Sequence, residues 1–145
     1  MLPATTREPR TSEEWRAYYN LRWQVLRAPW QQPRGSEKDE LDDEALHHMI
    51  IDNQQVIAVG RVHFIDAHTA QIRYMAVDPE YEKRGYGKQL LLSLEKSVKE
   101  NNIHEIILHA RESVTGFYEK QGYIIIKPSH TLFKKIKHYL MVKKI

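Results

Sequence analysis

The chain has 145 residues, of which 41% are hydrophobic and 28% charged, and its 22 Lys and Arg against 19 Asp and Glu give a formal net charge of +3. This composition predicts one globular domain over residues 1–145. The absence of cysteine excludes disulfide frameworks, thiolate metal sites and cysteine nucleophiles. Because no apolar run approaches the ~20 residues of a membrane-spanning helix and residues 1–5 do not resemble a signal peptide, we expect a cytoplasmic protein without a membrane partner.

The first long element that the sequence predicts is a helix from Thr11–Ser12 to about Arg27. Thr11 can cap its first turn in a capping box with Glu14, and Pro29 follows its end. A loop over residues 31–43 leads into an acidic cluster, which is either a solvated face or a site that attracts a cation or an amine. The cluster comprises Glu37, Asp39, Glu40, Asp42, Asp43 and Glu44.

The middle of the chain changes its hydrophobic period from two to 3.6. Two short strands at residues 48–51 and 56–59 flank a turn at residues 52–55, and a third strand follows at residues 70–77. Together the three strands form an antiparallel meander. Helical spacing of leucines then predicts a helix from Gly87 to Asn101–Asn102.

Four shorter elements complete the predicted fold. They are a strand at 106–108, a helix at 113–121 that stops at Gly122, and strands at 123–126 and 139–142. The resulting order, β-helix-βββ-helix-β-helix-ββ, indicates an α/β protein of the α+β type with one mixed sheet.

The segment between the third strand and the long helix carries the chemistry. Gly85 and Gly87 let the backbone approach a ligand where unpaired amides and the positive end of the helix dipole face outward, which favours phosphate. Lys83, Arg84 and Lys88 bracket these amides. An ordinary glycine-softened turn with solvated cations is the alternative, since the segment lacks the complete P-loop and Rossmann patterns.

Two longer motifs decide between these interpretations. An apolar strand end, Asp78-Pro79, an aromatic residue, Lys83-Arg84-Gly85-Tyr86-Gly87 and a Leu-Leu helix resemble motif A of the GCN5-related N-acetyltransferase (GNAT) family. Phe117-Tyr118-Glu119-Lys120-Gln121-Gly122-Tyr123 resembles motif B of the same family, in the expected order. Residues 36–47 and 138–141 resemble the ElaA-like branch of the family, but more weakly.

The resemblance implies a mostly antiparallel sheet of six to seven strands with about four helices, splayed between strands 4 and 5 to admit acetyl-CoA. It implies that the backbone of Met75, Ala76 and Val77 pairs with the pantetheine arm. The pyrophosphate would lie on the loop formed by Lys83, Arg84, Gly85, Tyr86, Gly87 and Lys88. Tyr118 would be the catalytic acid that protonates the departing thiolate.

Several residues depart from the family pattern. Glu82 places an acid at the expected pyrophosphate site, which we expect to weaken binding of the cofactor. Gln71 stands where several relatives carry a basic Glu, and Arg111 and Val114 replace a familiar Asn and Ala in motif B. The general base is therefore left open between His63, His109, His138 and a water relayed to Glu40 or Asp43.

The function that these features favour is direct acetyl transfer from acetyl-CoA to a primary amine, on either a small molecule or a protein. A catalytically weak acyl-CoA sensor is the alternative, and a nucleic-acid partner is disfavoured by the small net charge. No metal is assigned, because His47 and His48 are adjacent on a strand and point to opposite faces. The apolar strand at residues 139–142 favours a homodimer.

Overall fold

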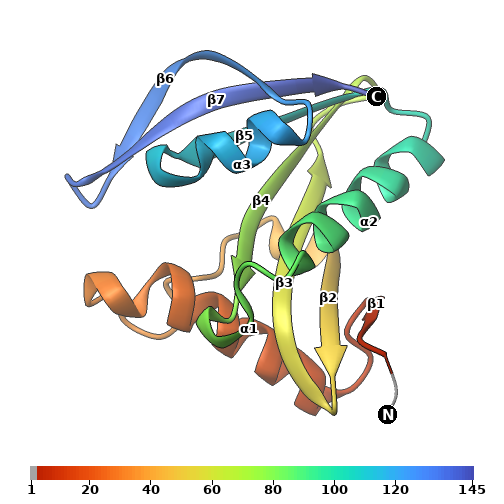
Figure 1. Cartoon of the computed structure of the whole chain (residues 1–145), viewed down its shortest axis with the longest axis vertical. Helices are drawn as coiled ribbons and strands as arrows, with labels where there is room; N and C mark the ends of the chain where they lie inside the picture. Colours follow the sequence, from red (N-terminus) through yellow and green to blue (C-terminus); the bar gives the residue numbers. More distant parts are fainter. Residues whose placement is uncertain (1–2) are drawn as a thin grey trace.

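Seven strands form one mixed sheet in the computed structural model, which describes residues 3–145 (Figure 1). The order across the sheet is β1-β2-β3-β4-β5-β7-β6, and β4 and β5 are the parallel neighbours in an otherwise antiparallel arrangement. The strands are β1 (Thr5–Arg7), β2 (Leu46–Asp52), β3 (Gln55–Phe64), β4 (Thr69–Val77), β5 (Glu105–Arg111), β6 (Ile124–Leu132) and β7 (Ile136–Lys144).

Three α-helices connect these strands in the predicted order. They are α1 (Ser12–Leu26), α2 (Tyr86–Glu100) and α3 (Thr115–Lys120), with short 3-10 turns η1 (Ala28–Trp30), η2 (Asp42–Glu44), η3 (Pro79–Tyr81) and η4 (Glu112–Val114). The family resemblance implied about four helices, and residues 3–145 contain these three α-helices together with the 3-10 turns. In the loop before β2, Asp39 and Asp42 side chains accept backbone N–H groups, which holds the chain in single turns instead of a further helix.

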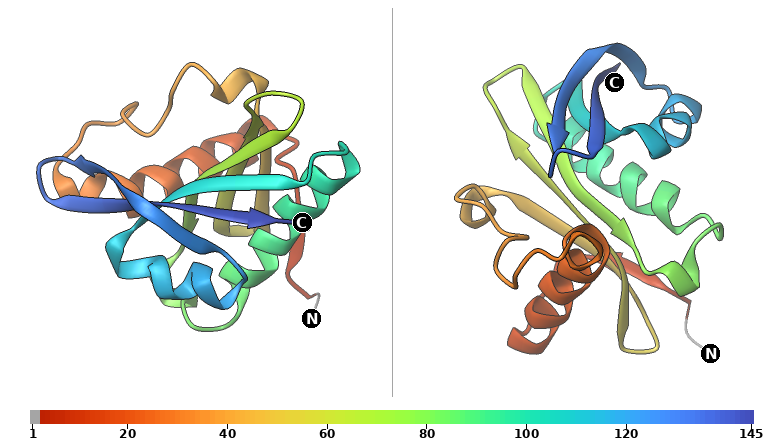
Figure 2. Two further views of the ribbon diagram at one scale, coloured as in Figure 1. Left: turned by 90° about the horizontal axis from the view of Figure 1, so that it is seen from above. Right: turned by 90° about the vertical axis from the view of Figure 1, so that its left-hand side faces the viewer.

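The helices divide between the two faces of the sheet (Figure 2). On one face, α1 places Tyr18 and Leu21 against apolar residues of β2, β3 and β4. On the other face, α2 packs the predicted leucines on β3 and β4, with α3 beside β5 and β6. A Cβ on Gly60 of β3 would lie 2.9 Å from Met75 Sδ and 3.0 Å from Leu94 Cδ1, so glycine allows α2 to approach the sheet closely.

His47 and His48 of β2 point to opposite faces of the sheet, as their adjacent positions on a strand predicted. The His47 ring bonds to the Tyr18 hydroxyl of α1, at 2.8 Å, whereas His48 contacts Ser93 and Ser97 of α2 on the opposite face. The two imidazoles therefore cannot share one ion.

The apolar strand at residues 139–142, which favoured a homodimer, is not at an edge of the sheet. Strand β7, which contains residues 139–142, lies between β5 and β6 and is hydrogen-bonded on both sides. The edge strand at this end of the sheet is β6, where Ile124, Ile125 and Ile126 are 66%, 38% and 55% exposed. A sequence pattern alone does not order the two final strands, because it marks each as a strand without telling which neighbours it pairs with.

Candidate active site

The sheet opens between its two parallel strands. Strand β4 pairs with β5 at three positions only, from Thr69 with Glu105 to Gln71 with Ile107. Beyond Gln71, β4 continues beside β3 while β5 continues beside β7, and the two halves of the sheet separate (Figures 1 and 2). The backbone of Met75, Ala76 and Val77 therefore has no strand partner on the β5 side.

An irregularity in β4 lies at this opening. The register with β3 shifts between Val59 and Arg61, and Tyr74 adopts a φ of +59°, which is rare for a residue with a side chain. Two consecutive side chains, Arg73 and Tyr74, consequently turn toward the α1 face. Arg73 bonds to Asp39 on that face, and the Tyr74 ring lies 4.3 Å from the guanidinium carbon of Arg22.

The loop after β4 presents free amides. Asp78 caps η3 by accepting the Glu80 N–H, and Gly85, at a φ of +86°, stands directly before α2. Within residues 3–145, the N–H groups of residues 83–88 donate to no protein acceptor, whereas the next amide, Gln89, bonds to Gly85 O at 3.0 Å. The side chains of Lys83, Arg84 and Lys88 are exposed beside these amides, and so is Glu82.

Tyr118 lies in α3, facing the core below the opening. Its ring packs edge-on against Phe117 and Tyr123 at centroid distances of 5.0 and 5.7 Å, and the residue is 8% exposed. Burial raises the pKa of its phenol, so the hydroxyl keeps its proton at neutral pH. No hydrogen bond within residues 3–145 engages this hydroxyl, in contrast to that of Tyr123, which donates to Glu95.

Three histidines gather on the α1 face of β5, β6 and β7. His130 stacks on His138 at a centroid distance of 4.3 Å and lies 5.5 Å from His109. Burial, together with neighbouring cations, lowers the pKa of all three, to about 4 for His138. His63 lies apart on β3, where its Nδ1 faces Arg61 Nη2 at 3.4 Å. His130 lies in no motif and was not predicted as a site residue, because it reaches the cluster only through the β6–β7 pairing.

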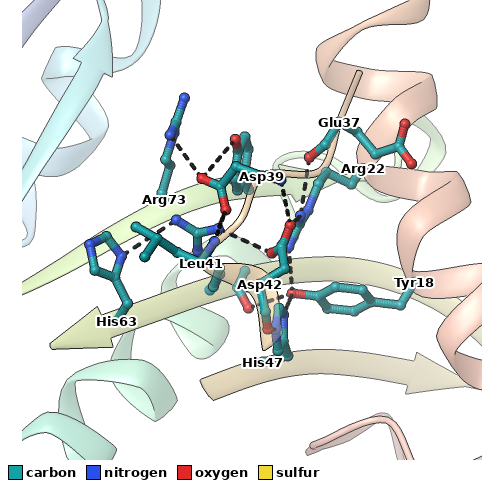
Figure 3. A network of polar contacts seen from close by, with 12 residues as sticks. Tyr18, Arg22, Glu37, Asp39, Leu41, Asp42, His47, His63 and Arg73 are labelled. Carbon is teal, nitrogen blue, oxygen red and sulfur yellow. Dashed lines mark hydrogen bonds and ion pairs between the residues drawn. The ribbon is translucent and has the colours of Figure 1, made fainter. Parts of the chain in front are cut away.

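Two members of the acidic cluster, Asp39 and Asp42, form a largely buried ionic network, whereas Glu40, Asp43 and Glu44 are exposed (Figure 3). Asp42 binds Arg22 and Arg61 with Nη1–Oδ1 distances of 3.0 and 3.1 Å, and both guanidinium side chains are fully buried. Asp39 pairs with Arg61 and with Arg73. The hypothesis of a solvated face is therefore wrong for these two residues and for Glu37, which is 5% exposed and accepts the Gly35 N–H.

Sequence comparison places this architecture in a known class. A sheet that divides between its parallel strands, next to a helix that begins with unpaired amides, defines a transferase of the GNAT fold. Residues 15–123 match the acetyltransferase (GNAT) family, and the chain belongs to this family.

Relatives and solved structures agree with this assignment. A Bacillus subtilis protein described as an acetyltransferase is 34% identical over 116 residues, which are 77% of this chain and 76% of the relative. Escherichia coli ElaA is 18% identical with a TM-score of 0.80, covering 99% of this chain and 100% of that chain. A GNAT acetyltransferase from Elizabethkingia anophelis, solved with acetyl-CoA bound, is 19% identical with a TM-score of 0.74, covering 98% of both chains.

No helix within residues 3–145 is both long enough and apolar enough to cross a membrane.

Proposed function

We propose that the protein transfers an acetyl group from acetyl-CoA to a primary amine, with both substrates bound at once. The observation that carries this proposal is the placement of two unsatisfied backbone surfaces in series along one segment. The free edge of β4 at residues 75–77 leads directly into the free amides of residues 83–88. An extended amide-containing arm that ends in a pyrophosphate would satisfy both surfaces, and the relative from Elizabethkingia binds such a molecule.

The loop at residues 83–88 suits a diphosphate in charge and shape. Its amides point outward at the positive end of the α2 dipole, with three cationic side chains around them. Gly85 has the left-handed conformation that exposes these amides, and no atom lies within 4 Å of the position of a Cβ there. Glu82 is exposed at the edge of the loop, so its carboxylate can turn into solvent, away from the pyrophosphate. Its negative charge therefore weakens binding of acetyl-CoA without blocking it.

Direct transfer needs a polarised carbonyl, a base and an acid. A backbone N–H near Met75 polarises the thioester carbonyl. The amine nitrogen attacks the carbonyl carbon, a C–N bond forms, and the amine loses a proton to the base. The C–S bond then breaks, and Tyr118 gives its phenolic proton to the thiolate. Burial raises the pKa of Tyr118, so the phenol still holds its proton at neutral pH, and no hydrogen bond within residues 3–145 engages it in another direction.

Among the histidines, we propose His109 as the base. In neutral His63, Nδ1 accepts a hydrogen bond from Arg61, so its proton resides on Nε2 and no lone pair remains free. His138 donates from Nδ1 to Ile136 O, and its pKa of about 4 makes it a weak base at neutral pH. The Nδ1 atom of His109 is buried without a partner within residues 3–145.

A sensor that binds acyl-CoA without turnover is the second candidate. It is favoured by Gln71 and Arg73, which occupy the α1 face of β4 and cannot accept a proton at neutral pH. Release of the CoA thiol separates the two candidates, because a sensor would bind acetyl-CoA saturably and release no thiol with any amine.

Calorimetric titration with acetyl-CoA tests the cofactor site. We expect saturable binding, and we expect Arg84→Gln to weaken it by roughly tenfold, the loss of one charge-assisted phosphate contact. Lys96→Gln, which removes an equal charge from the exposed side of α2, is the matched control and should bind like the wild type. Absence of binding at millimolar acetyl-CoA would refute the proposal.

A further inference from the structure

Two arginines meet on the α1 face of the opening, one from each half of the sheet. Arg27 caps the C-terminal end of α1, which packs on β3 and β4, whereas Arg111 ends β5. Arg27 Nη1 and Arg111 Nη2 each donate to Leu26 O at 3.1 Å. The two guanidinium groups therefore converge on one carbonyl oxygen, and Arg27 is only 6% exposed.

Neither of these guanidinium groups has a carboxylate partner within residues 3–145. The other arginines of this face are paired, since Arg22 and Arg61 bind Asp42 and Arg73 binds Asp39. The nearest acid in sequence, Glu112, is exposed and accepts the Tyr139 hydroxyl at 2.9 Å. Burial lowers the pKa of Arg27 and of Arg111, and the charge of Arg27 lowers that of Arg111 further. The acceptors of the pair are neutral carbonyl oxygens, Leu26 O for both and Ser36 O at 3.0 Å from Arg27 Nε, so a bound anion would supply the charge compensation that these carbonyls do not.

The histidines and the cavity beside this pair are neutral or cationic. The histidine cluster of His109, His130 and His138 lies on the same face, where burial lowers the pKa of each imidazole and keeps it neutral at neutral pH, and the Arg27 guanidinium carbon is 5.5 Å from the Phe133 ring centroid. Phe133 borders a cavity of about 290 Å³ between η1 and the β6–β7 turn. This cavity is lined by Trp30, Gln31, Gln32, Phe133, Lys134 and Lys135, so its charged lining is cationic.

We propose that the acceptor is a small amine that also carries an anionic group, a carboxylate or a phosphate, bound by Arg27 and Arg111. This inference rests on the proposed acetyl transfer and assigns its second substrate. The arginines lie on the face opposite α2 and α3, so the anionic group would enter from the side away from the pyrophosphate loop. Its amine would then face the β4–β5 opening. Cationic amines such as polyamines would meet uncompensated like charge and bind poorly.

Matched pairs of amines, which differ only in the anionic group, test the proposal. The pairs are glycine with glycinamide, β-alanine with β-alaninamide, and phosphoethanolamine with ethanolamine, with spermidine as a cationic probe. The full chain is assayed for thiol release at saturating acetyl-CoA. We expect kcat/KM for the anionic member of at least one pair to exceed that of its neutral partner by tenfold or more. The carboxylate and phosphate pairs identify which anion is bound.

Variants assign the effect to the arginine pair. Arg111→Gln should raise KM for the preferred anionic amine at least tenfold, with KM for acetyl-CoA unchanged. Arg111→Lys, which keeps the charge but loses the planar fork, should retain part of the binding and tests folding through its melting temperature. Lys137→Gln is the control: it removes the same charge from an exposed side chain next to His138. Its kinetics should match the wild type.

The outcomes separate this inference from the function on which it rests. Equal or faster turnover of the neutral amines or spermidine would overturn the anionic acceptor and leave acetyl transfer intact. Failure to bind acetyl-CoA would overturn the function itself. If acetyl-CoA binds but no amine of the panel is acetylated, the CoA-loaded protein is titrated calorimetrically with glycine, β-alanine and phosphoethanolamine. Saturable binding that Arg111→Gln abolishes would support the proposal, and its absence would refute it.

Discussion

Replacing Asp42 by Asn should destabilise the protein more than any other single neutralisation in the acidic cluster. The Asp42 side chain is 5% exposed and receives N–H groups from Arg22 and Arg61 and from the backbone of Asp39, the last at 2.8 Å. Both guanidinium side chains are fully buried. Asn keeps the shape of the side chain but removes the charge that compensates them.

The loss of stability expected for Asp42→Asn follows from the buried arginine charges that lose their partner. Breaking a buried ion pair by removing one partner costs about 3–5 kcal/mol, because the remaining charge is desolvated without compensation. Asp39 still pairs with Arg61, so the loss falls mainly on Arg22, and the lower end, about 3 kcal/mol, is expected. Asp43→Asn, one residue away, removes an equal charge from an exposed side chain and should change stability by less than about 0.5 kcal/mol.

Urea unfolding as a function of pH measures this cost. Burial opposes ionisation of Asp42, but Arg22 and the Asp39 N–H outweigh it and hold the pKa of Asp42 below its ordinary value. A depressed carboxyl pKa contributes stability that is complete above the unfolded pKa of about 4 and disappears as the pH falls below it. The difference between Asp42→Asn and wild type should therefore be full at pH 7 and shrink below pH 4. A difference under 1 kcal/mol at pH 7, or one that does not change with pH, would refute the assigned role of the network.

Three further variants test the proposed catalytic assignments. Tyr118→Phe should lower kcat by about 10²-fold with unchanged KM for acetyl-CoA, and should not lower the melting temperature, because the lost hydroxyl has no hydrogen-bond partner; a twofold effect would exclude the acid role. Gly85→Ala should cost about 1–2 kcal/mol at its φ of +86° and weaken acetyl-CoA binding in calorimetry, whereas Gly116→Ala, where φ is not positive and a Cβ meets nothing within 4 Å, should do neither. His109→Gln should abolish the acidic limb of the kcat/KM profile for amine acetylation, and an unchanged limb would exclude His109 as the base.

Local patterns predicted the elements that depend on local physics. Leu90, Leu91, Leu94 and Val98 recur at helical spacing, and all four are buried along α2. Thr11 accepts the Glu14 N–H at 3.1 Å, as a cap should. In the reciprocal half of the predicted capping box, the Glu14 carboxylate binds mainly the Arg7 guanidinium and the Arg10 N–H, and the Thr11 N–H contributes least to lowering its pKa. Arg7 lies in β1, and its approach to α1 is set by the pairing of β1 with β2.

The candidate site also has one part that the local sequence predicted and one part that it did not. The glycines and amides of residues 83–88 lie in one contiguous segment, so the sequence predicted them together with the cofactor. The arrangement of the α1 face depends instead on side chains from several elements far apart in the sequence, and on a bulge that turns both Arg73 and Tyr74 to one side. No spacing rule predicts a bulge, because an inserted residue reverses the alternation of the strand at a single point.

The acidic cluster shows why charge density along the chain is a poor guide to the charge of a site. Glu37 to Glu44 contains six carboxylates, and from composition alone it favours a cationic acceptor. Two of these carboxylates are neutralised by arginines that α1, β3 and β4 bring to them. Arg27 and Arg111, which have no carboxylate partner within residues 3–145, lie at the opening itself. For the acceptor that we propose, these two arginines, and not the density of acids along the chain, set the sign of the binding site.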